Sequence, residues 1–73
     1  MLKEQFWQRI SIDPRIMTGK PVINGTRIPV ELVVRMLAQG IPDREILQEY
    51  PRLAPDDVRA ALAYAAHTLT DVG

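Results

Sequence analysis

The sequence predicts a mostly α-helical domain in which a short β-strand and a β-hairpin precede a three-helix, helix-turn-helix (homeodomain-like) unit. Two features carry this prediction. Two short β-prone runs flank the pair Asn24 and Gly25, which is the strongest short-range pattern for a hairpin. Three apolar segments with helical spacing follow, and Pro or Gly residues separate them.

The segment before the helices is expected to be β-structured. Polar and apolar residues alternate over residues 9–12, which predicts a short strand. The hairpin is expected to pair residues 22–23 with residues 26–28. Asn24 and Gly25 lie between these runs, and both residues tolerate the positive φ angles of a type I′ turn.

The helices are expected over residues 30–39, 42–50 and 55–69. Gly40 should end the first helix in the left-handed cap position, and Pro42 stands where the second helix is capped. In the third helix, the predicted buried stripe consists of Val58, Ala61, Leu62, Ala65 and Leu69, while Arg59, Ala60, Ala63 and His67 are expected outside it.

Both ends of the chain are expected to lie outside a single domain of residues 10–69, whose hairpin occupies 20–29. Residues 1–9 are interpreted as an arm, and residues 70–73 as a frayed tail. Phe6 and Trp7 are adjacent aromatic residues in this arm. We expect them to anchor in a pocket of a partner, whereas in a folded first element they would be ordinary core residues.

Length and composition exclude several classes of protein. The chain has 73 residues, contains no Cys and has one His, so we expect one domain with a modest core, no disulfide, no metal site and no cofactor. A small core that no disulfide or metal site stabilises favours self-association, so a homodimer is expected. No apolar run is long enough to cross a membrane, and the N-terminus lacks the apolar core of a signal peptide, so we expect a cytoplasmic protein.

Several short motifs occur in an order that is specific when they are taken together. They are Ile12-Asp13-Pro14, the run from Gly19 to Val30, Leu37 to Gly40, Glu45 to Leu47 with Tyr50-Pro51, and Asp57-Val58 with Ala61-Leu62. In these motifs, from about Ile10 to Ala66, the chain resembles domain-of-unknown-function family 433. Its members are short, antitoxin-like bacterial proteins that are commonly encoded beside a PIN-like nuclease toxin. The resemblance implies such a toxin as the partner, together with autoregulation through DNA.

Charge is unevenly distributed, although the net charge is zero. Basic residues predominate in residues 1–35 and acidic residues in 36–73, so a polyanion should prefer the first half and a basic protein the second. The third helix would be the DNA-recognition helix, but it begins with Pro55, Asp56 and Asp57, which a phosphate-lined groove repels. The candidate DNA contacts are therefore Lys20, Arg27, Arg9 and Arg15 around the hairpin, with Arg59 on the third helix. Two alternatives remain open: solvated surface charges, or a clamp between Arg27 and a carboxylate.

No catalytic residue is expected, and the chain is interpreted as a non-enzyme. His67 is the one His, and Glu45 and Glu49 share a helix face without a neighbouring base. Ala60 and Ala63 would let a partner approach closely, although helix propensity alone explains them equally well. Two hypotheses follow: an antitoxin-like protein that neutralises a nuclease toxin, or a DNA-binding helix-turn-helix regulator without a toxin partner.

Overall fold

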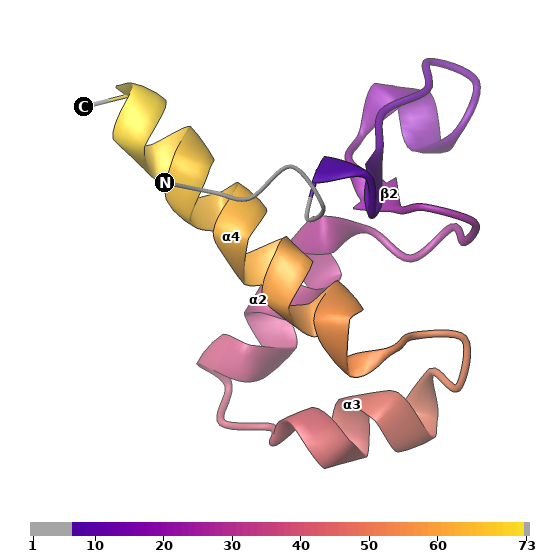
Figure 1. The fold of residues 1–73 in the computed structure, drawn as a ribbon, viewed down its shortest axis with the longest axis vertical. Coiled ribbons are helices and arrows are strands. Elements are labelled where there is room, and N and C mark those ends of the chain that lie inside the picture. The colour runs from indigo at the N-terminus through magenta and orange to yellow at the C-terminus, as the bar shows by residue number, and fades with distance from the viewer. Residues whose placement is uncertain (1–6, 73) are drawn as a thin grey trace.

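The computed structural model describes residues 7–72, in which helices α2, α3 and α4 follow a small sheet along the chain and lie below it and to its left in Figure 1. The elements are β1 (Ile10–Ser11), the 3₁₀ helix η1 (Met17–Gly19), β2 (Val22–Ile23), α2 (Val30–Ala38), α3 (Asp43–Glu49) and α4 (Pro55–Val72). α2 and α4 pack against each other, and α3 contacts both. The predicted fold class is confirmed. Within the described part of the chain, no helix is both long enough and apolar enough to cross a membrane.

The sheet pairs β1 with β2 in antiparallel orientation. Ile10 lies opposite Ile23, and Ser11 lies opposite Val22. The N–H of Asn24 donates to the carbonyl oxygen of Arg9 at 2.7 Å and extends this pairing by one bond. The strand expected within residues 9–12 is therefore confirmed. Its partner is the run that had been expected to pair with residues 26–28.

The predicted hairpin forms, but its second arm lies at residues 28–30 rather than 26–28. Val22 bridges Pro29, and the N–H groups of Ile23 and Val30 donate to the carbonyl oxygens of Ile28 and Pro21 at 2.9 Å each. The hydroxyl of Thr26 donates to the carbonyl oxygen of Ile23 at 2.7 Å and accepts the N–H of Ile28 at 3.0 Å. These local bonds make Thr26 part of the turn between the two arms, because a Thr hydroxyl can bond to nearby backbone groups.

The turn type also differs from the prediction. The N–H of Thr26 donates to the carbonyl oxygen of Ile23 at 3.0 Å, so Asn24 and Gly25 are the central residues of this turn. Gly25 has a φ of 81°, whereas Asn24 is not among the residues with positive φ. A type I′ turn requires positive φ at both positions, and a type II turn requires it at the second alone. The type I′ prediction is therefore wrong.

The helices begin and end near their predicted boundaries. α2 ends at Ala38, and Gly40 follows with a φ of 88°, which a left-handed cap requires. Pro42 is the N-cap of α3 and supplies no side-chain hydrogen bond. α4 continues to Val72, so the expected frayed tail over residues 70–73 is helical as far as Val72.

The core lies where the three helices and β2 meet. α2 contributes Val30 and Val33 to this core. The buried cluster comprises Ile23, Val30, Val33, Ile46, Leu53, Val58 and Ala61.

The buried face of α4 is rotated relative to the predicted stripe. Leu62 is 46% exposed and Leu69 is 75% exposed, although both were expected to be buried. Ala60 is 1% exposed, so it cannot form part of a surface patch for a partner. A contact between distant parts of the chain explains this rotation. Trp7 packs edge-on against Tyr64 and His67, whose ring centroids lie 5.8 Å and 4.9 Å from its own. Tyr64 and His67 lie on the same side of α4 as Ala60.

This packing also corrects the predicted N-terminal arm. Trp7 contacts α4 of its own chain, which contradicts its assignment to a free arm seeking a partner. The other predicted anchor, Phe6, lies outside the described residues. Ala63 is half-buried, so it offers a partner less surface than was expected.

The carboxylate of Asp57 connects the start of the chain to the last helix. The residue as a whole is 8% exposed, so it counts as buried. Its Oδ2 accepts the N–H of Ala54 at 2.8 Å, which caps the first turn of α4, and its Oδ1 accepts Nη1 of Arg9 at 3.0 Å. Both oxygens of this buried charge are therefore satisfied, one by the helix end and one by the residue before β1.

We expect Asp57→Ala to lower the free energy of unfolding by about 2 kcal/mol, because it removes a helix cap and leaves Arg9 without its closest partner. Urea denaturation measures this difference. Asp56→Ala is the matched control, since Asp56 is 59% exposed and lies 3.6 Å from Arg9. It should cost less than ~0.5 kcal/mol. Equal losses in the two variants would contradict the role assigned to Asp57.

Candidate binding surfaces

Most of the predicted DNA contacts are ion-paired within the chain. Arg9 binds Asp57 at 3.0 Å and lies 3.6 Å from Asp56. Arg15 binds Asp13 through two side-chain bonds of 3.1 Å each. A nucleic acid would have to compete with these carboxylates, so the structure does not present these two Arg residues as free cations.

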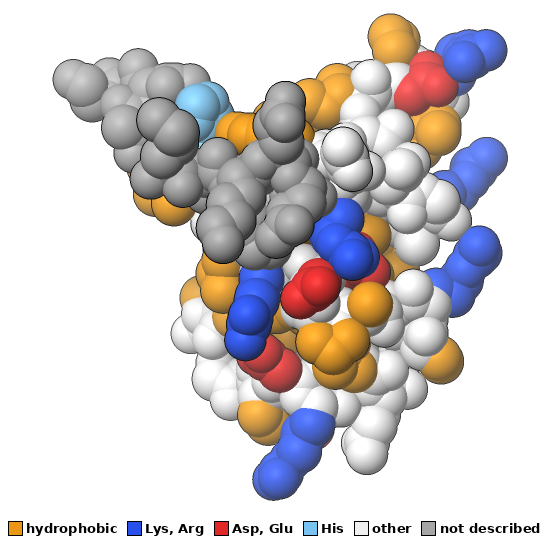
Figure 2. Space-filling view, viewed as in Figure 1, with side chains coloured by type: hydrophobic (Ala, Val, Ile, Leu, Met, Phe, Trp, Pro, Cys, Tyr) orange, Lys and Arg blue, Asp and Glu red, His pale blue; other side chains and the backbone are white. Residues whose placement is uncertain are grey.

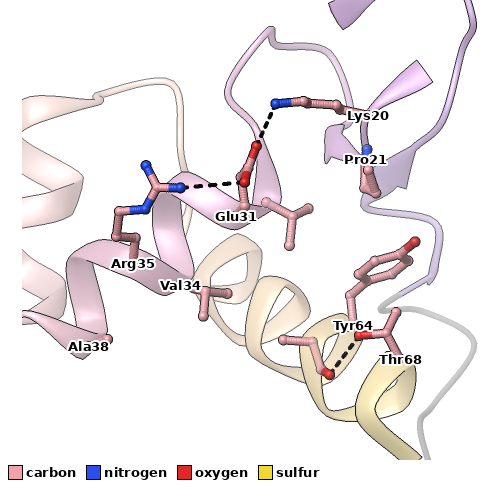
Figure 3. A pocket seen from close by; sticks show the side chains of 10 residues that line it. Lys20, Pro21, Glu31, Val34, Arg35, Ala38, Tyr64 and Thr68 are labelled. Carbon is pink, nitrogen blue, oxygen red and sulfur yellow. Dashed lines mark hydrogen bonds and ion pairs between the residues drawn. The ribbon is translucent and has the colours of Figure 1, made fainter. Parts of the chain in front are cut away.

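Lys20 and Arg35 flank Glu31 on the surface of α2. Nζ of Lys20 lies 2.9 Å from Oε1 of Glu31, and Nη2 of Arg35 lies 3.5 Å from Oε2 (Figure 3). The hydrogen bond and charge of Lys20 are the main causes that lower the pKa of Glu31 below its ordinary value. In the same way, the hydrogen bonds from Arg15 lower the pKa of Asp13. Lys20 thus has a counter-charge within its own chain.

Arg27 and Arg59 differ from the other candidates. Both are exposed, and within the described residues neither makes a hydrogen bond or ion pair. Among the described residues, Arg27 therefore forms no clamp with a carboxylate of its own chain, and a clamp with a carboxylate of a dimer mate stays a prediction. Arg27 lines a hollow beside Arg52, and Arg59 does not line it. Sequence reasoning missed Arg52, because only the fold brings the turn after α3 to the turn after β2.

An apolar groove of about 500 Å³ lies between α2 and α4 (Figure 3). Its walls include Val34 and Ala38 of α2 and Tyr64 and Ala65 of α4. The ion pairs of Lys20, Glu31 and Arg35 form one polar rim. Exposed Leu62 and Leu69 lie one turn before and after Ala65, so they extend the apolar surface along α4. Sequence periodicity had placed these two Leu residues in the core.

The exposed face of α3 is acidic. Asp43, Glu45 and Glu49 are all exposed, and Arg44 is the basic residue among them. Glu45 and Glu49 also line a second hollow of about 520 Å³ beside Ile41. Among the residues that the structure describes, no group of three or more His, Asp or Glu side chains is placed to hold a metal ion. The carboxylates of α3 form an acidic surface.

Comparison with known proteins places the chain among uncharacterised relatives. The family described as "Protein of unknown function (DUF433)" matches residues 10–65. A crystal structure of a DUF433 member protein from Anabaena variabilis has a TM-score of 0.79 and 37% sequence identity, covering 94% of this chain and 69% of that one.

Two curated relatives have no assigned role. The uncharacterized protein y4eO of Sinorhizobium fredii is 36% identical over 56 residues, which are 77% of this chain and 25% of that protein. The match thus spans a quarter of that relative's length. An uncharacterized protein of Archaeoglobus fulgidus is 55% identical over 29 residues, which are 40% of this chain and 81% of that protein.

Because the pKa of Glu31 is lowered in the folded protein, its ionised form stabilises the fold. This contribution is fully present above the unfolded pKa and is lost as the pH falls through the lowered folded pKa. Glu31→Gln should therefore melt below the wild type at pH 7, and the difference should shrink once the pH falls below about 4. Thermal melting from pH 3 to pH 7 measures it.

Glu45→Gln is the control for this titration, since Glu45 is exposed and has no ion pair with a described residue. Its melting temperature should follow the wild type at every pH. A Glu31→Gln deficit that is as large at pH 3 as at pH 7 would show that the ion pair is not its cause.

Proposed function

This chain belongs to the DUF433 family, and we propose that it is an antitoxin-like protein that binds and neutralises a cognate nuclease toxin. In this proposal it acts in the cytoplasm by binding alone and catalyses no reaction. The observation that carries the proposal is the apolar groove between α2 and α4, together with exposed Leu62 and Leu69 beside it. Apolar surface of this extent on so small a domain favours an interface with another protein.

Charge supports a nuclease as the partner. A protein that cleaves nucleic acid needs a basic surface around its cleft, because its substrate is a polyanion. The exposed carboxylates of α3 would complement such a surface. The proposed mechanism is steric and electrostatic: α4 docks its apolar strip beside the cleft, and α3 covers the basic residues that would otherwise bind the substrate.

The apolar strip also supports self-association. Leu62, Ala65 and Leu69 follow the alternating spacing of three and four residues that is typical of a helix–helix seam. We propose a homodimer in the absence of the toxin, with α4 of one protomer lying along α4 of its partner.

Light scattering of the purified protein should give the mass of a dimer, and Leu62→Ser/Leu69→Ser should give a monomer. A monomeric wild type at ~100 µM would contradict the dimer, since that concentration saturates a micromolar complex.

A second candidate function is a DNA-binding regulator without a toxin partner. It is favoured by Arg27, which is exposed beside the turn after β2 and has no counter-charge among the described residues. The first turn of α4 does not support this function, because Asp57 is occupied by Arg9 and by the helix cap. DNA would therefore have to bind through the turn rather than through a recognition helix.

Co-expression with the protein encoded by the adjacent reading frame tests the toxin proposal. A stable complex should form at micromolar concentration. Leu62→Ser/Leu69→Ser should weaken it by more than about tenfold, because apolar anchors carry much of the affinity of an interface. Isothermal titration calorimetry measures the affinity.

The control is Ile12→Ser, which removes an apolar side chain that is 58% exposed and lies outside α4. It should leave the affinity unchanged. Because Leu62 is 46% exposed, urea denaturation should accompany the titration to show that each variant is folded. If Ile12→Ser weakens the complex as much as the Leu variants do, the surface of α4 beside the groove is not the toxin site.

A further inference from the structure

The chain neutralises many of its own cations. Among the described residues, a carboxylate lies within ion-pair distance of Arg9, Arg15, Lys20 and Arg35. The remaining basic residues of that part of the chain, which have no such carboxylate, are Arg27, Arg44, Arg52 and Arg59. The charge of these four is not offset by a carboxylate of the described residues, so they attract an external anion most strongly.

Two of these four Arg residues line one hollow. It has a volume of about 460 Å³ and lies between the turn after β2, which carries Arg27, and the turn before α4, which carries Arg52. Its polar lining includes Ser11 of β1 and Asn24, and no Asp or Glu side chain lines it. In Figure 2, Lys and Arg side chains project from the same edge of the molecule on which the β2–α2 connection lies in Figure 1. The hollow therefore carries two guanidinium groups and no carboxylate.

The fold holds one guanidinium in place. Nη2 of Arg52 donates to the carbonyl oxygen of Gly25 at 3.1 Å, which ties the α3–α4 turn to the β2–α2 turn. This bond uses one of five N–H donors, so the others remain available. Arg27 uses none of its donors within the described residues. A preorganised guanidinium beside a free one suits an oxyanion that accepts several hydrogen bonds at once.

We propose that the hollow formed by Arg27 and Arg52 binds a phosphate group, and that this phosphate belongs to a nucleic-acid backbone. The non-bridging oxygens of a phosphodiester can accept bonds from both guanidinium groups. Arg27 and Arg52 are both exposed, so a strand can reach them from solvent. Such a contact would position the protein without reading bases. This inference rests on the DNA-binding candidate function and does not depend on a toxin.

The test measures binding of a short DNA duplex by fluorescence anisotropy between 50 and 200 mM salt, a range over which phosphate contacts weaken by orders of magnitude. Arg27→Ala should weaken binding by roughly tenfold, as expected for a lost charge-assisted bond, and lower the slope of log affinity against log salt by about one. Arg52→Ala should act in the same direction. Arg44→Ala removes the same charge from α3, outside the hollow, and should match the wild type.

Arg27→Ala is the decisive variant, because its side chain supports nothing else in the described fold, whereas Arg52 also braces a turn. Thermal melting of Arg52→Ala separates that bracing from binding. In a parallel experiment, inorganic phosphate is titrated and the backbone amide resonances of Gly25 and Thr26 are followed by NMR. Shifts in the wild type that are lost in Arg27→Ala support the site.

The possible outcomes separate the site from the function. If the duplex binds equally to Arg27→Ala, Arg44→Ala and the wild type, the site is overturned while DNA binding stands. If phosphate shifts the Gly25 and Thr26 resonances but no duplex binds, the assignment to nucleic acid is overturned. If neither ligand binds, or if an acidic peptide binds the hollow and phosphate does not, the phosphate site itself is overturned.

Discussion

The buried carboxylate of Asp57 is the constraint on which the arrangement of this small domain depends. Each strand of the sheet has two residues, so the sheet alone cannot fix its own position against the helices. Asp57 caps α4 with one oxygen and binds Arg9, directly before β1, with the other. One side chain thus sets both the start of the last helix and the point at which the N-terminal segment crosses it. Trp7 then packs two turns further along α4, over the same face.

This arrangement has a consequence for any interpretation as a helix-turn-helix protein. The order and packing of α2, α3 and α4 resemble such a unit, yet the N-terminal turn of α4 is engaged in holding the fold. A recognition helix needs free donors in that turn, whereas here a carboxylate and its Arg partner occupy it. The three helices therefore act as a scaffold that positions the candidate binding surfaces. Two of the unpaired cations, Arg27 and Arg52, lie on the turns, and exposed Leu62 and Leu69 lie on α4.

The helices could be predicted to within a few residues because their boundaries are local. Gly40 and the Pro residues before α3 and at the start of α4 act on the backbone beside them, whatever the tertiary structure. The turn after β2 was predicted less well, since the Thr26 hydroxyl bonds to the backbone of Ile23 and Ile28 and β2 also pairs with β1. The face of α4 and the pairing of Arg9 with Asp57 depend on contacts between residues far apart in the chain, and no periodicity encodes them. For the same reason, Arg52 could not be recognised before the fold brought it to Gly25.

The two candidate surfaces can be occupied independently. The groove is built by α2 and α4, the hollow by the sheet and the turns around it, and no residue lines both. A protein seated on the groove would therefore leave Arg27 and Arg52 accessible, provided that it does not extend past the rim at Lys20. The segment between them is fixed at both ends, since Val30 N–H bonds to the Pro21 carbonyl oxygen at 2.9 Å while β2 pairs with β1. Backbone hydrogen bonds already hold this segment in the free protein. A ligand bound at one surface would therefore change the conformational freedom of the other surface very little. Coupling between the two sites is therefore expected to be weak unless their ligands touch each other.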